Sequence, residues 1–289
     1  MNYTVTELKK GIKVHFIETN KFKTNLFSIF ITTPITRENV TKNALLAKVL
    51  RRGSSLYNTQ DKISIELEEM YGAELDCGID KIGDDQVIKF YLEALNDKYV
   101  PEKEKITKKC IEIIANIVFN PYCIDNKFNA EYVQGEKENL KQLILGKIDN
   151  KNKYALDRCT EEMCKDKSYG LYKFGYVEDL EDINEESLYV YYKELISNAK
   201  IDVFISGDFE KNNMMELIEQ NKDIEGLSQR DAKIAEDVKI EKVSQIKKVE
   251  DNMDVSQGKL VIGLNTNEEK IDDMYTALMY NAILGGGAN

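Results

Sequence analysis

Few side chains in this 289-residue chain could hold a metal ion or act as a catalytic base. The chain has one histidine, His15, in an apolar run that is typical of a β-strand. A zinc site with two histidine ligands is therefore impossible within these residues. We interpret His15 as a strand residue with a satisfied side chain, and a functional role for it is the alternative.

The five cysteines do not follow a metal-binding or disulfide pattern. Cys159 and Cys164 lie about one and a half turns apart on an expected helix, so their thiols diverge. No second pair has Cys-x-x-Cys spacing, and a nucleophilic cysteine would have to take its base from His15. The odd number of cysteines indicates reduced thiols. We expect no metal site and no cofactor.

Two other patterns have simple structural explanations. The neighbouring pairs Glu68-Glu69 and Glu161-Glu162 diverge on a helix, which is typical of solvated faces. Three glycines at 285–287 could suggest a phosphate loop, but they follow a helical pattern and lack the Lys-Ser/Thr of such loops. A turn that ends a helix explains them better.

Composition and charge exclude several classes of protein. A net charge of −11, from 40 basic and 51 acidic residues, repels a phosphate backbone, so we expect no nucleic acid partner. The longest strongly apolar run, residues 110–119, is about half as long as a membrane-spanning helix. The first residues do not form the apolar core of a secretory signal. We therefore expect a cytoplasmic protein with no membrane association.

Hydrophobic periodicity predicts an α+β fold in which an antiparallel sheet carries helices on one face. The expected strands are residues 4–8, 13–18, 26–33, 73–78, 86–95 and 201–206. The expected helices are residues 41–52, 59–71, 105–118, 185–197 and 211–220, with a long helical stretch over 129–165 that is interrupted near 146 and 149–150.

The chain divides into one long unit and the start of another. We predict a domain over residues 1–225, a linker and the start of the next domain over 226–257, and an incomplete second domain over 258–289. The polar stretch 228–254 could instead be a solvated loop within one domain. Residues 259–264 read as a strand and 272–284 as a helix that is similar to the helix near residue 44. One strand and one helix cannot bury an apolar face, so we expect a piece of a longer protein with two similar halves.

Six segments in order resemble the insulinase, pitrilysin and mitochondrial-processing-peptidase family of zinc peptidases, and specifically its short bacterial YmfF-like members. The segments are 43–55 (NALLAKVLRRGSS), 66–78 (ELEEMYGAELDCG), 114–122 (IANIVFNPY), 132–144 (YVQGEKENLKQLI), 203–209 (VFISGDF) and 277–287 (ALMYNAILGGG). The resemblance covers nearly the whole chain. It implies two α+β halves of the LuxS and processing-peptidase type around a chamber that holds peptides, with the second half truncated here.

The zinc chemistry of that family is absent from this sequence. The family uses a His-x-x-Glu-His helix motif and a downstream Glu as ligands and base. The matching positions here are Ala44, Ala47 and Lys48, and the downstream ligand position, seven residues after Glu136, is Leu143. The resemblance thus implies a peptidase homologue that is inactive alone, although whether it is an enzyme stays open.

The resemblance also implies a role for such a subunit. We expect a non-catalytic partner that forms a peptide-processing chamber as a heterodimer with an active relative, or as a homodimer. Substrates of the catalytic relatives add as a strand to a sheet edge, which here corresponds to residues 73–78. Glu74, Asp76 and Cys77 are therefore candidate peptide contacts, unless they belong merely to an edge strand. The acidic charge would favour basic peptides, although solubility explains it equally well.

Two other functions are compatible with the same residues. The chain could be a stand-alone peptide-binding or scaffolding protein, which an adjacent gene with an intact zinc motif would argue against. It could also be a hydrolase with different chemistry, which would require turnover that survives metal chelation.

Overall fold

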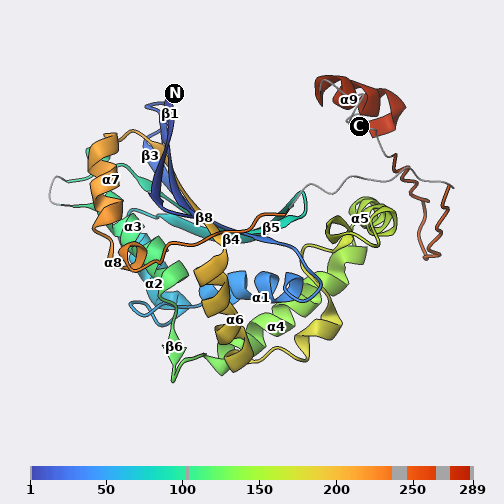
Figure 1. Cartoon of the computed structure of the whole chain (residues 1–289), viewed down its shortest axis with the longest axis horizontal. Coiled ribbons are helices and arrows are strands. Elements are labelled where there is room, and N and C mark those ends of the chain that lie inside the picture. The colour runs from blue at the N-terminus through green and yellow to red at the C-terminus, as the bar shows by residue number, and fades with distance from the viewer. Residues whose placement is uncertain (1, 102–103, 236–245, 265–273, 287–289) are drawn as a thin grey trace.

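The structure is a computed structural model that describes residues 2–101, 104–235, 246–264 and 274–286. A curved six-stranded sheet carries helices on its convex side (Figure 1). The predicted α+β class, with a largely antiparallel sheet and helices on one face, is confirmed.

The predicted strands of the long unit all form. They are β1 (Asn2–Lys9), β2 (Ile12–Glu18), β3 (Thr24–Pro34), β4 (Glu74–Ile82), β5 (Asp85–Leu95) and β8 (Lys200–Gly207). A separate short hairpin, β6 (Cys123–Ile124) with β7 (Lys127–Phe128), was not predicted, because two-residue strands carry no periodic pattern.

The strand order of the sheet is β1-β2-β8-β3-β5-β4. The neighbours pair antiparallel except β2 and β8, which are parallel, with His15 opposite Phe204. The late strand β8 thus lies between two early strands. Within the described residues β1 and β4 each have one paired neighbour, so each forms an edge of the sheet.

The predicted helices of the long unit also form. They are α1 (Val40–Leu50), α2 (Gln60–Glu69), α3 (Ile106–Phe119), α4 (Ala130–Leu145), α5 (Lys151–Met163), α6 (Glu185–Asn198) and α7 (Lys211–Glu219). The short α8 (Lys222–Glu225) was not predicted. The predicted interruption is a 3-10 turn at Gly146–Ile148, after which the Asn150 side chain accepts a hydrogen bond from the Lys153 amide and starts α5.

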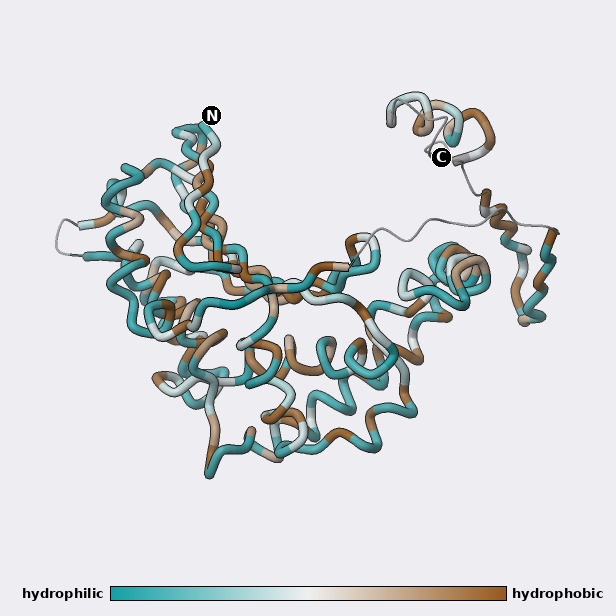
Figure 2. Tube along the Cα trace, in the orientation of Figure 1, coloured by the Kyte–Doolittle hydropathy of each residue, from teal (hydrophilic) through white to brown (hydrophobic). Residues whose placement is uncertain are grey.

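The main core lies between the sheet and the helices α1 and α3. Alternate strand residues face this layer, as Ile201, Val203 and Ile205 of β8 do with exposures of 0–6%. Figure 2 shows hydrophobic and hydrophilic residues interleaved along the strands. Each such aliphatic side chain stabilises the fold by about 1.5–3 kcal/mol when it is fully buried.

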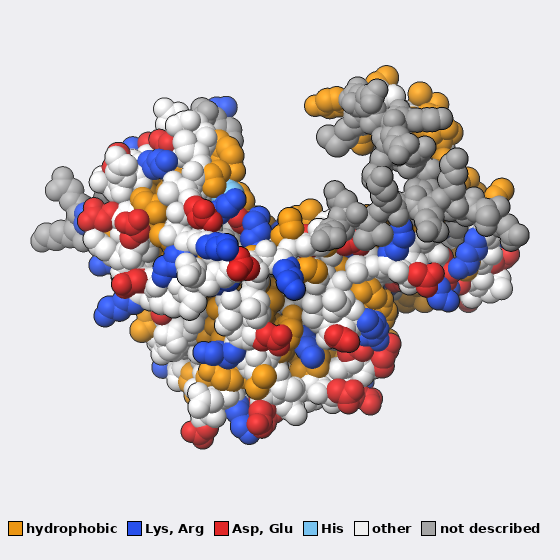
Figure 3. All heavy atoms as spheres, viewed as in Figure 1, with side chains coloured by type: hydrophobic (Ala, Val, Ile, Leu, Met, Phe, Trp, Pro, Cys, Tyr) orange, Lys and Arg blue, Asp and Glu red, His pale blue; other side chains and the backbone are white. Residues whose placement is uncertain are grey.

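On the concave face of the sheet, the described residues form a layer of rings and charges and no helical layer. The rings of His15, Phe204, Phe30 and Tyr91 follow one another across three strand boundaries, with centroids 4.1, 4.9 and 5.5 Å apart. Apart from His15, these rings are only half-buried. The space-filling view shows a hollowed surface there with mixed side chains (Figure 3).

The segment after the long unit differs from the prediction. Residues 259–264 form no strand, because none of the other described strands lies beside them to accept their backbone hydrogen bonds. The segment 246–264 instead follows α5, where Asp251 accepts hydrogen bonds from Tyr154 (2.9 Å) and Arg158 (3.2 Å). Part of the predicted linker, residues 236–245, lies outside the described residues.

The last described helix is α9 (Met274–Asn281), which continues into one wider turn at Ala282–Gly286. Residues 272–273 of the predicted helix lie outside the described residues. Gly285 has a φ of 121°, a conformation that glycine adopts readily and that suits the predicted helix-ending turn. Leu278, Met279 and Ile283 are exposed by 58–80%. The division into domains stays a prediction.

Among the described helices, none combines the length and apolar character that crossing a bilayer requires.

Candidate functional site

The three positions of the lost zinc motif lie on α1, which packs below β4 and β5 and against α4. The Ala44 and Ala47 side chains are each 2% exposed, and Lys48 is half-buried. The spacing of these residues places them on one side of the helix. The small methyl groups therefore fill a tightly packed layer in which a histidine ring would need more room.

The fourth position, Leu143, lies on α4 two turns beyond Glu136. Glu136 is 7% exposed and is held by two neighbours: Arg52 Nε is 3.2 Å from its Oε1, and Asn139 Nδ2 donates to its Oε2 at 3.1 Å. The Arg52 guanidinium also lies 5.5 Å from the centre of the Tyr132 ring. Thus Glu136 is already paired with a cation of the chain.

Two further cations, Arg51 and Arg52, directly follow the last residue of α1 on the side that carries the motif positions. Lys48, Arg51 and Arg52 are spaced three and four residues apart, so they share one side. Arg51 Nη2 donates to the backbone carbonyl of Leu75 in β4 at 3.2 Å. Lys48 forms no hydrogen bond or ion pair within the described part of the chain. The sequence prediction missed Arg51 and Arg52, although their spacing from Lys48 is visible in the sequence.

The candidate peptide contacts lie on the edge strand β4, on its two different sides. Glu74 and Asp76 are exposed on the concave side, whereas Cys77 points toward α1 and is partly buried. Burial raises the pKa of the Cys77 thiol to about 11, although the positive charges of Arg51 and Lys48 oppose that rise. The thiol is therefore protonated near neutral pH and is a poor nucleophile.

The residues present do not fit a zinc ion. Ala44, Ala47 and Leu143 offer no lone pair, and Lys48 brings a positive charge. Within the described residues, no three His, Cys, Asp or Glu side chains are grouped to hold a metal. The side chains at these positions thus offer no ligand set for the activation of water on a metal.

The interpretation of His15 as a satisfied strand residue is confirmed. Its Nδ1 lies 2.8 Å from the Tyr3 hydroxyl and its Nε2 lies 2.9 Å from Asp202 Oδ1. Asp202 also pairs with Lys200 Nζ at 2.7 Å. Both ring nitrogens are therefore engaged, and the histidine joins β1, β2 and β8.

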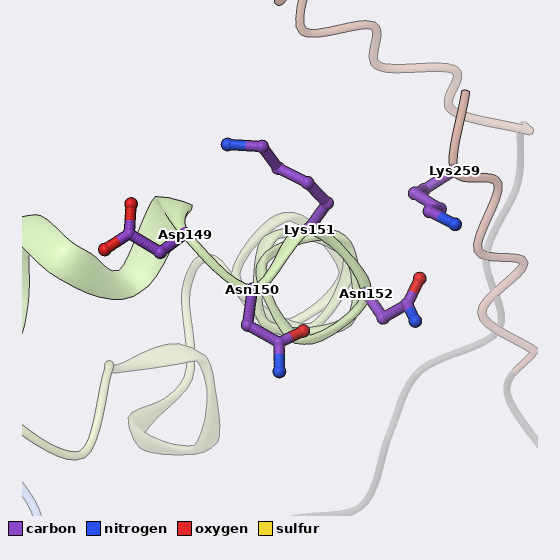
Figure 4. Close-up of a pocket in the computed structure, with 5 residues that line it drawn as sticks. All are labelled: Asp149, Asn150, Lys151, Asn152 and Lys259. Carbon is purple, nitrogen blue, oxygen red and sulfur yellow. The ribbon is translucent and has the colours of Figure 1, made fainter. Parts of the chain in front are cut away.

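A shallow hollow elsewhere in the chain offers no comparable site. It lies at the start of α5 and is lined by Asp149, Asn150, Lys151, Asn152 and Lys259. Figure 4 shows that these side chains do not converge on a common point. We find no cooperating groups there.

Comparisons with known proteins agree with this geometry. The peptidase M16 inactive domain family matches residues 182–289. A Bacillus subtilis (strain 168) protein named "Probable inactive metalloprotease YmfF" is 34% identical over 290 residues, which cover 99% of this chain and 67% of that protein.

Two solved structures share the fold. A conserved protein from Enterococcus faecalis V583 matches with a TM-score of 0.76 and 27% identity over 82% of this chain and 55% of that one. A peptidase M16 inactive domain from Pseudomonas fluorescens matches with a TM-score of 0.63 and 17% identity over 82% of this chain and 54% of that one. The chain thus spans about two thirds of the curated relative and about half of each solved chain.

Proposed function

Because this chain belongs to the M16, or insulinase, peptidase family and lacks the zinc-binding residues of its active members, we propose that it is a non-catalytic subunit that holds peptides for an active partner. One observation carries the proposal. The edge strand β4 lies beside α1, which packs against the sheet and carries Ala44, Ala47 and Lys48 at the positions of the family's ligands and base.

The outer edge of β4, which has no partner strand within the described residues, suits the addition of an extended peptide. Leu75 accepts a hydrogen bond from Arg51 through its carbonyl, which places that backbone oxygen on the outer side of the strand. Alternate residues of an antiparallel edge strand direct their backbone groups outward, so Cys77 also does. Backbone hydrogen bonds there would give affinity, and the alternating side chains of β4 would give selectivity.

The proposal includes a partner because the site offers groups that can bind a peptide but none that can catalyse its hydrolysis. A relative with an intact His-x-x-Glu-His motif would contribute the metal and the general base, and the two chains would enclose the peptide. A homodimer is the other assembly that we consider. We further propose that the protein acts in the cytoplasm and favours basic peptides, since its net charge is −11.

The direct experiment mixes the full-length natural protein with an active relative from the same genome. We expect the two to co-elute in size-exclusion chromatography, and hydrolysis of a fluorogenic peptide to rise severalfold over the active relative alone. Chelation of the metal should abolish the whole gain, because only the partner holds zinc. The absence of both co-elution and a gain in hydrolysis would refute the proposal.

A matched pair of variants tests the role of the edge strand. Cys77→Pro removes one outward backbone N–H, which an edge strand tolerates structurally, and should reduce the gain in hydrolysis. Cys77→Ala keeps the N–H and should preserve the gain. Equal effects of the two variants would show that the peptide does not pair with this edge.

The outer edge of β4 also supports the alternative, a stand-alone peptide-binding or scaffolding protein. Peptide binding by the chain without co-elution of any active relative would favour it.

A further inference from the structure

Two of the three cations on the motif side of α1 form no ion pair with a carboxylate of the described residues. Among Lys48, Arg51 and Arg52, Arg52 alone has such a pair within these residues, with Glu136. Arg51 donates to a neutral carbonyl, and Lys48 has no hydrogen-bond or ion-pair partner within the described part of the chain. Two cations therefore have no carboxylate partner in the described part of a protein whose net charge is −11.

These two cations lie beside the edge of β4. Arg51 touches the Leu75 carbonyl, and the pKa of the Cys77 thiol, which burial raises, is lowered in part by the charges of Arg51 and then Lys48. Asp76 is the nearby carboxylate on the strand, but the alternation of β4 directs it to the opposite, concave side. It is therefore poorly placed to neutralise Lys48.

The Lys48 side chain can offer its charge to an incoming anion. It is half-buried, so part of its stem is covered by neighbouring residues, and no carboxylate within the described residues pairs with its ammonium group. The guanidinium of Arg51 still has donors free for a second contact, because one of its nitrogens makes the bond to Leu75. A carboxylate at this point would receive charge-assisted hydrogen bonds from two side chains.

We propose that Lys48 and Arg51 form a carboxylate-binding site beside β4, which takes an acidic side chain or the C-terminal carboxylate of a bound peptide. The identity of the ligand as a peptide rests on the proposed function. The side chains of an added strand alternate, so the carboxylate would point toward α1. The same group turned to the concave side would meet the negative charges of Glu74 and Asp76.

The first test measures peptide binding to the full-length natural protein by fluorescence anisotropy at low salt. The probes are extended peptides of one sequence with a central Glu, the same with Gln, and each with a free or an amidated C-terminus. We expect about tenfold tighter binding when the recognised carboxylate is present. The four peptides distinguish a side-chain carboxylate from a terminal one.

Matched variants on α1 test whether Lys48 causes the preference for the acidic peptide. Lys48→Gln should remove most of the preference for the acidic peptide and leave binding of the neutral peptide unchanged. Lys42→Gln removes the same charge from the other end of the helix, where Lys42 lies 5.4 Å from the Tyr191 ring, and should preserve the preference. Equal affinity of the wild type for all four peptides would overturn the carboxylate site and leave the proposed function intact.

A second measurement does not depend on strand addition. Residue-resolved alkylation of Cys77, read by mass spectrometry, should slow in Lys48→Gln because the pKa of the thiol rises when a neighbouring positive charge is removed. N-acetylglutamate should slow alkylation in the wild type but not in Lys48→Gln. If no peptide binds but N-acetylglutamate protects Cys77, the proposed function fails and the site stands. If N-acetylglutamate gives no protection in the wild type, the site is refuted by this measurement as well.

Discussion

The two faces of the sheet are built from the same strands but serve different purposes. The convex face is closed by α1 and α3, and residues such as Phe16 and Phe90 are 0% exposed there. The concave face holds the half-buried rings of Phe204 and Phe30 beside the His15 network. Stability therefore depends chiefly on one face, and the other is freer to change its chemistry.

The largest loss of stability is expected from a change on the convex face, which α1 and α3 cover. Phe90→Ala should lower the free energy of unfolding by about 3–5 kcal/mol, because it opens a cavity in the layer between β5 and α3. Denaturant titration followed by circular dichroism measures this change. A loss below about 1 kcal/mol would mean that the closed face is not the main source of stability.

The next effect is on the buried polar network of the concave face. Asp202→Ala should cost about 1–3 kcal/mol, because it leaves His15 Nε2 and Lys200 Nζ without their acceptor. Asp202→Asn keeps an acceptor oxygen and should cost less in the same titration. Equal losses in the two variants would show that the hydrogen bonds contribute little.

The row of aromatic rings on the concave face should contribute less to stability than the core does. Phe204→Ala removes contacts with His15 and Phe30 but leaves no closed cavity, so we expect a loss of about 1–2 kcal/mol. Phe204→Ala and Phe90→Ala make the same chemical change on opposite faces of the sheet, so their losses of stability can be compared directly. A loss as large as that of Phe90→Ala would abolish the distinction between the two faces.

The smallest effect is at the edge of the concave face. Asp76→Ala should change stability by less than about 0.5 kcal/mol, since the side chain is exposed and makes no ion pair within the described residues. Its effect should appear instead in weaker binding of basic peptides. Thermal unfolding and a peptide titration of the same preparation separate the two outcomes.

Much of the fold was predictable because its signals are local. The period of two in β5 and the period near 3.6 in α3 follow from which residues face the core, and both elements were placed to within about two residues. The position of β8 between β2 and β3 was not predictable, because strand partners are set by contacts far apart in sequence. The strand expected at 259–264 failed for the related reason that a strand needs a neighbour.

The candidate site was predicted in part. Ala44, Ala47, Lys48 and Leu143 were identified by resemblance, and the structure places them on α1 and α4. Grouping Cys77 with Glu74 and Asp76 overlooked the strand alternation that separates them. The bond from Arg51 to Leu75 joins residues 24 positions apart, and nothing in either local pattern predicts it.

The position of β8 has a consequence for how the chain acquires its structure. Without β8, the pairings of the sheet leave β1 with β2 and β3 with β5 and β4 as two separate antiparallel groups, and β8 begins only at residue 200. Until β8 has been synthesised, β2 and β3 would therefore each present an unpaired edge. We expect the nascent chain to depend on chaperone protection during that interval, and the closure of the sheet by β8 to be the slow step in refolding.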